Sequence, residues 1–85
     1  MINGIDNPVE WALVFYELEE VIEHLQTLSN QIIPQESIDE KDFETHMRHI
    51  YAHLNLIWNS RHHIGEISNE TRNQLSQFPT DINPL

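Results

Sequence analysis

Two apolar stripes with heptad spacing constrain this chain more than any other feature. In the first stripe, apolar residues recur at intervals of three and four, at Trp11, Val14, Leu18, Val21, Leu25, Leu28 and Ile32. In the second, the same spacing links Phe43, Met47, Ile50, Leu54, Ile57 and Ile64, with Arg61 at the one remaining position. Because such intervals gather side chains on one side of an α-helix, the pattern predicts two long helices packed along their stripes.

The first helix has clear start and stop signals. Asn7 is a suitable N-cap, Pro8 fits the first helical position, and Glu10 completes a capping-box spacing. Pro34 predicts the end, since proline disfavours helical geometry in the residue before it. We therefore expect this helix over about 8–33.

The second helix is bounded in a similar way. Ser37 followed by Glu40 forms another capping-box pattern, and Gly65 is a typical residue just beyond a helix end. These signals predict a helix over about 38–64. Because the connection between the two helices is short, they are expected to run antiparallel.

A short third helix is predicted over about 69–77, capped by Ser68 or Asn69 and stopped by Pro79. The tail 80–85 is expected to be irregular. With 85 residues the chain predicts one all-α domain, 1–85, whose core is thin. A second copy that completes a four-helix bundle is a common remedy, so we expect a homodimer.

The charge balance narrows the classes of partner. The chain has fourteen acidic residues and only four Lys and Arg, and no Lys or Arg lies in the first forty positions. Direct binding to nucleic acid or to an anionic membrane is not expected, because both need cations. A basic protein partner is the complementary expectation, with Glu19, Glu20 and Glu23 as an acidic face on the first helix.

Composition also bears on the compartment. The absence of cysteine excludes disulfides and thiolate metal sites, and the N-terminal residues resemble no secretory signal. The longest apolar run is too short to cross a bilayer. These features favour a cytoplasmic protein.

The apolar surface near the start of the first helix is wider than a hairpin needs. Side chains outside the stripes add to it, and the end of the second helix should lie beside it. We therefore predict a partner-binding or dimer surface formed by Trp11, Leu13, Tyr16, Tyr51, Leu56, Trp58 and Arg61.

Histidines form a second seam beside the stripes. In heptad terms, Glu17 and His24 share one position on the first helix, and His46 and His53 share the same position on the second. In an antiparallel pair these positions face each other, which predicts His24 opposite His46 and Glu17 opposite His53. His49 lies on the same arc of its helix.

Three roles remain open for this seam. It is a structural polar row, a group that responds to physiological pH, or a divalent transition-metal site that uses Glu17, His24, His46, His49 and His53. The two facing pairs lie about 10 Å apart along each helix, so all four positions are not expected to reach one ion.

A carboxylate pattern follows on the first helix. Glu19-Glu20-Val21-Ile22-Glu23, then twelve intervening residues and Glu36-Ser37-Ile38-Asp39, resembles the EExxE…ExxD motif of all-α MazG-type nucleotide pyrophosphatases. The resemblance implies Mg²⁺ held by paired helices against a nucleoside triphosphate. Here Glu36 precedes the predicted Ser37 cap, and the first forty residues offer no cation to meet phosphates.

Taken together, the sequence favours a non-enzymatic, acidic interaction protein. An inhibitor, antitoxin or immunity-type factor that covers a basic surface fits the charge and size. The alternatives are a metal-binding helical protein that uses the histidine seam and, more remotely, the MazG-like pyrophosphatase.

Overall fold

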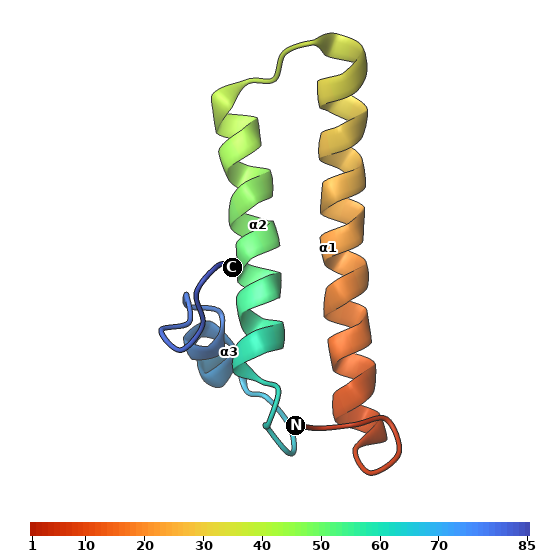
Figure 1. Cartoon of the computed structure of the whole chain (residues 1–85), viewed down its shortest axis with the longest axis vertical. Helices are drawn as coiled ribbons and strands as arrows, with labels where there is room; N and C mark the ends of the chain where they lie inside the picture. The colour runs from red at the N-terminus through yellow and green to blue at the C-terminus, as the bar shows by residue number, and fades with distance from the viewer.

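The computed structural model describes residues 1–85 and contains three α-helices and no strand. They are α1 (Pro8–Gln35), α2 (Glu40–Asn59) and α3 (Asn69–Leu75). The two long helices run antiparallel side by side, and α3 lies against the C-terminal part of α2 (Figure 1). The predicted all-α hairpin with a short third helix is confirmed.

The first helix continues through Pro34 to Gln35, beyond the predicted end at residue 33. Pro34 is tolerated because it lies in the last turn, where it removes one backbone hydrogen bond without breaking a longer helix. The helix stops at Glu36, which takes a left-handed conformation with φ 55°. Its N–H donates to the Ile32 carbonyl at 3.1 Å and closes the last turn.

The second helix is shorter than predicted at both ends. Asp39, not Ser37, is the N-cap, and its carboxylate accepts from the Asp42 N–H at 3.3 Å. The helix ends at Asn59 instead of residue 64. The Arg61 carbonyl accepts a hydrogen bond from the Ile2 N–H at 2.8 Å, so docking of the N-terminal segment replaces the next helical bond.

The core is thin and lies between the two long helices. Val21 and Leu28 of α1 pack with Ile50 of α2, flanked by Ile38 and Met47. At the other end, N-terminal residues cover part of the surface that the sequence left unpaired. Ile2 is buried there, and Gly4 lies so close to the Trp11 indole that an added Cβ would come within 3.0 Å of it.

The third helix is held by amide side chains of α2. Asn59 donates to the Leu75 and Gln77 carbonyls at 2.7 and 2.9 Å, and Asn55 donates to the Ser76 carbonyl at 3.0 Å. These bonds satisfy carbonyls at the end of α3 and fix that end at Leu75, two residues before the predicted 77.

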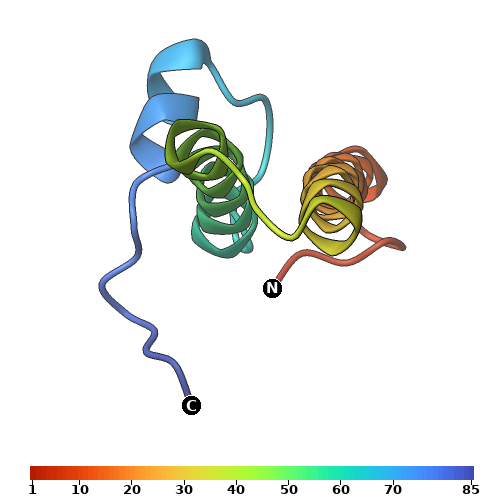
Figure 2. The same cartoon turned by 90° about the horizontal axis from the view of Figure 1, so that it is seen from above.

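Viewed along the hairpin, α3 and the tail leave α2 on opposite sides. The third helix lies on one side of the plane of the two long helices, and the C-terminal tail extends on the other (Figure 2). Residues 80–85 contain no helix, as expected. No helix combines the length and apolar character that a bilayer crossing requires.

Candidate metal centre

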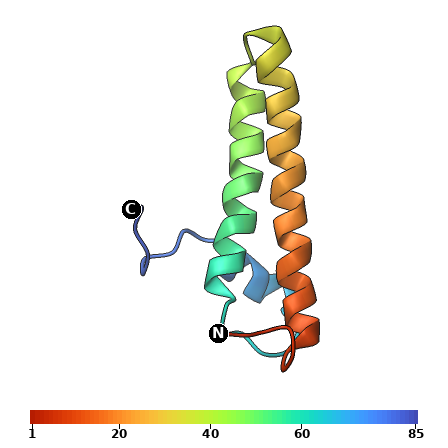
Figure 3. The ribbon, with the colours of Figure 1, turned by 45° about the vertical axis from the view of Figure 1, so that its right-hand side comes forward.

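The hairpin brings the histidine seam of α2 against α1 in the predicted register. His53 Nδ1 forms a hydrogen bond with Glu17 Oε2, and the rings of His24 and His46 lie edge to face with centroids 5.9 Å apart. Both facing pairs expected from the heptad positions are therefore present. Their alignment follows from the short connection between helices that pack side by side (Figure 3).

His24 contacts more of the seam than the spacing along the helices indicated. Its ring stacks on His49 at 4.9 Å with an interplanar angle of 5°, and its centroid lies 5.7 Å from that of His53. One ring nitrogen from each of these three histidines lies within 4.8 Å of the others. Three candidate ligands, not the full set of five, therefore converge.

The convergence has a simple cause. Side chains lean toward the N-terminus of their own helix, and the two helices are antiparallel. His24 on α1 and His53 on α2 therefore lean toward each other, which shortens the distance that rise per residue predicts. His49 lies between His46 and His53 on α2 and completes the group.

Glu17 is buried and already fully engaged. Its carboxylate is 1% exposed; one oxygen pairs with His53 and the other accepts from Arg72 Nη2 of α3 at 2.6 Å. Glu17 is thus a poor candidate for direct metal ligation, contrary to its place in the predicted ligand set. Its position instead suits the orientation of a ligand, because a carboxylate that accepts from Nδ1–H of His53 leaves Nε2 free as a ligand atom.

The electrostatics favour neutral imidazole at the centre of the group. Burial lowers the pKa of His24, and the neighbouring His49, His53 and His46 lower that pKa further. Neutral imidazole is the form that binds a metal ion, so less proton competition opposes binding at His24.

The size of the group is close to that of a zinc site. Nitrogen ligands about 2.1 Å from a tetrahedral Zn²⁺ lie about 3.4 Å apart, so modest ring rotations would close the 4.8 Å group around an ion. His49 is exposed and borders a hollow of about 320 Å³ with Thr45 and Arg48. An ion would reach the group from that side, and three ligands would leave a fourth position open.

The remaining histidines lie outside this group. His46 is half-buried beside His24, and its Nδ1 is buried without a hydrogen-bond partner. His63 lies beyond the end of α2, where its Nε2 is 3.2 Å from the Glu66 carbonyl oxygen. His62 is exposed there as well.

The structure divides the predicted partner surface. Leu56 is 1% exposed and is therefore a core residue and not part of an exposed surface. Leu13 is half-buried and lines an apolar groove with Ile67. Trp11, Tyr16 and Tyr51 remain exposed.

Trp58 and Arg61 are occupied by the C-terminal tail. The Trp58 indole N–H and the Arg61 guanidinium both donate to the Asp81 carboxylate, at 2.9 and 3.1 Å, and the guanidinium stacks 3.8 Å from the indole centroid. These two hydrogen bonds lower the pKa of Asp81, and the bond from Trp58 has the larger effect.

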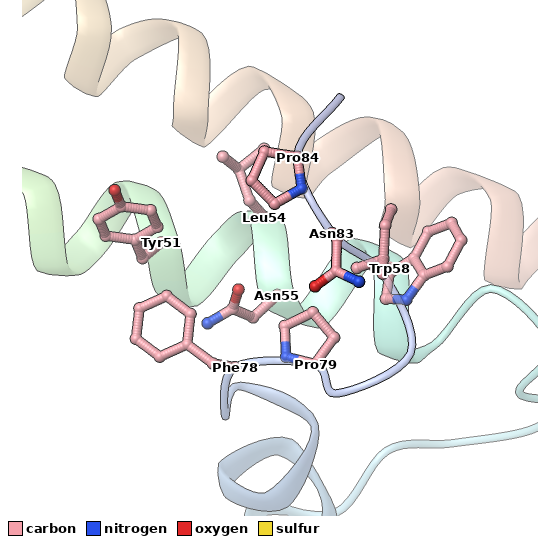
Figure 4. A pocket seen from close by; sticks show the side chains of 9 residues that line it. Tyr51, Leu54, Asn55, Trp58, Phe78, Pro79, Asn83 and Pro84 are labelled. Carbon is pink, nitrogen blue, oxygen red and sulfur yellow. The ribbon is translucent and has the colours of Figure 1, made fainter.

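Between α2 and this tail lies a groove of about 380 Å³ (Figure 4). Tyr51 and Phe78 line it, with ring centroids 5.1 Å apart in an edge-to-face arrangement. Since the tail itself forms one wall, the groove belongs to the packing of residues 78–84 on α2.

The acidic face lies on α1. Glu19 and Glu23 are exposed, and Glu20 is half-buried. Glu36 is at the left-handed cap of α1 and Ser37 and Ile38 lie in the connection, so the second half of the MazG-like pattern is not on a helix. The paired-helix arrangement that the resemblance implies is absent from these positions.

Arg72 is the residue of this site that sequence reasoning missed. It lies on α3, 55 positions from its partner Glu17, and no periodic pattern links the two. The only available signal was that Arg72 is the one cation within the third helix of an otherwise acidic chain. Comparison with protein-family models, with curated proteins and with solved structures found no significant match.

Proposed function

We propose that the protein binds one divalent transition-metal ion between α1 and α2, with His24, His49 and His53 as ligands. The observation that carries this proposal is the convergence of one ring nitrogen from each histidine within 4.8 Å. Imidazole suits Zn²⁺, Cu²⁺, Ni²⁺ and Fe²⁺, and Zn²⁺ is the natural probe because it accepts three histidines with an open fourth position.

The surroundings of the three histidines support the same role. Metal-bound histidines commonly donate their second ring nitrogen to a carboxylate, which fixes the tautomer and the ring orientation. Glu17 is in position to accept such a hydrogen bond from His53, and Arg72 donates to the other oxygen of the same carboxylate. Burying a carboxylate is costly unless it is paired, and one of the two partners of Glu17 is a prospective ligand, His53.

Isothermal titration calorimetry with Zn²⁺ tests the proposal. The protein should bind one equivalent, and His49→Ala should weaken binding at least about tenfold by removing an exposed ligand whose loss disturbs no core residue. His62→Ala is the matched control, because His62 is an exposed histidine outside the group. Binding that survives in His49→Ala, or that is lost equally in His62→Ala, would contradict the assignment.

Protein binding is a second candidate function, favoured by the apolar side chains that stay exposed along both long helices. The expectation of an acidic, non-enzymatic interaction module rests on these side chains and on the carboxylates of α1. Recognition of a basic surface predicts an association rate that falls as salt rises, which stopped-flow binding measures.

A further inference from the structure

One face of the hairpin carries a row of half-exposed apolar side chains. Each of its six members exposes 40–50% of its surface, and we call this row the open face: Trp11, Leu18, Leu25, Ile32, Phe43 and Leu54. All six are stripe positions that the sequence predicts to be core. Of the other stripe members, the hairpin buries Val21, Leu28 and Ile50.

The open face lies opposite the histidine seam. Glu17 and Arg72 place α3 on the seam side, and Figure 2 shows the N-terminal segment and the tail on the other side of the long helices. Gly4 lies beside Trp11, and the tail lies beside Leu54, so these segments reach only one end of the open face. In a four-helix bundle, each pair of antiparallel helices presents a row of such stripe residues to the other pair.

The size of this surface fits a dimer. With Phe15 and Ile22, which lie beside it on α1, the open face exposes roughly 700 Å², if a large apolar residue presents about 200 Å² when fully exposed. A stable interface buries about 800 Å² on each partner, and a monomer rarely exposes one apolar patch this large.

We propose that a second copy of this chain docks on the open face and completes a four-helix bundle. This surface is separate from the histidine group, so the dimer and the proposed metal site stand or fall independently. Measurements in EDTA keep bridging by metal ions out of the result.

Sedimentation equilibrium in EDTA tests the dimer. The wild-type chain should sediment at twice its mass at micromolar concentration. Leu25→Glu, which puts a charge at the centre of the open face, should weaken the dimer at least about tenfold while far-UV circular dichroism stays helical. Ile5→Glu is the matched control, because Ile5 is 91% exposed in the N-terminal loop. A monomeric wild-type chain, or a dimer indifferent to Leu25→Glu, would overturn the proposal and leave the face to a different protein.

Discussion

Glu17 is the most deeply buried charged group of the chain and links all three helices. It lies on α1, takes a hydrogen bond from His53 of α2, and pairs with Arg72 of α3. A carboxylate in this position can serve stability alone, because it joins segments that share few other contacts. What suggests a further role is its hydrogen bond to a histidine that lies close to two more imidazoles.

Replacing Glu17 by glutamine separates these roles. A glutamine amide that accepts from Arg72 must present its NH₂ to His53 Nδ1, which forces the ring proton to Nε2 and removes the lone pair from the histidine group. We expect Zn²⁺ affinity to fall about 10–100-fold and the free energy of unfolding to fall by about 1–3 kcal/mol.

Calorimetry measures the affinity, and ¹⁵N NMR of the imidazoles measures the tautomer. Glu19→Gln is the control, since Glu19 is an exposed carboxylate on the same helix. A Glu17→Gln variant that keeps both the wild-type tautomer and the wild-type affinity would show that Glu17 serves stability alone.

At the scale of the elements, the helix ends follow hydrogen bonds more closely than residue preferences. Ser37 has a good capping residue type and spacing, yet the chain leaves α1 through a left-handed Glu36 and reaches helical geometry only at Glu40. Asp39 is therefore the residue whose side chain meets a free N–H. The end of α2 is decided in the same way by the backbone of Ile2.

The cap at Asp39 predicts unequal effects of two neighbouring substitutions. Asp39→Ala should lower the free energy of unfolding by about 1 kcal/mol, because it removes the bond to the Asp42 N–H. Ser37→Ala should leave it unchanged within about 0.5 kcal/mol, because Ser37 is exposed and caps nothing. Urea denaturation of both variants checks the pair, and a larger loss in Ser37→Ala would restore the cap that the sequence predicted.

At the scale of the whole molecule, contacts between distant segments hold the ends of the chain on the hairpin. The Ile2 N–H of the N-terminal segment donates to the Arg61 carbonyl, and Asn55 and Asn59 of α2 hydrogen-bond to the end of α3. Asp81 of the tail accepts a hydrogen bond from Trp58 of α2. Because the chain buries few apolar residues, these polar contacts contribute a larger share of its stability than they would in a larger domain.

The Asp81 tie should respond to acid. Its pKa in the folded protein is lowered from the ordinary 3.8 by the bonds from Trp58 and Arg61. A lowered pKa means that the unfolded chain takes up the proton more readily, so the contribution is complete above about pH 4 and is lost as pH falls through the lower, folded value. Below that window the tail should leave α2.

The indole N–H signal of Trp58 in an NMR titration reports this change. The signal should shift at a pH below 3.8, the ordinary pKa of the carboxyl, and Asp81→Asn should lack the transition. Glu66→Gln serves as the control, because Glu66 is an exposed carboxylate that pairs with no cation. A Trp58 signal that titrates in the same way in Asp81→Asn would assign the transition to another group.

The sequence by itself determined the helices, their antiparallel order and the facing of Glu17 with His53 and of His24 with His46. These properties depend on local periodicity and on one short connection, which residues a few positions apart encode. The periodicity also predicted which side of each helix is apolar. It did not predict which apolar residues the hairpin buries, since Trp11, Leu18 and Leu25 are half-exposed and Val21 is buried.

The tertiary structure alone decided the rest. That three imidazoles meet follows from the lean of side chains on antiparallel helices, which spacing along one helix does not contain. Arg72 pairs with Glu17, 55 positions away, and Asp81 pairs with Arg61, 20 positions away. No repeating sequence pattern links the partners of either pair, so both pairs depend on how the segments dock. Periodicity encodes the face of a helix, whereas these pairings form only when the faces of different elements meet.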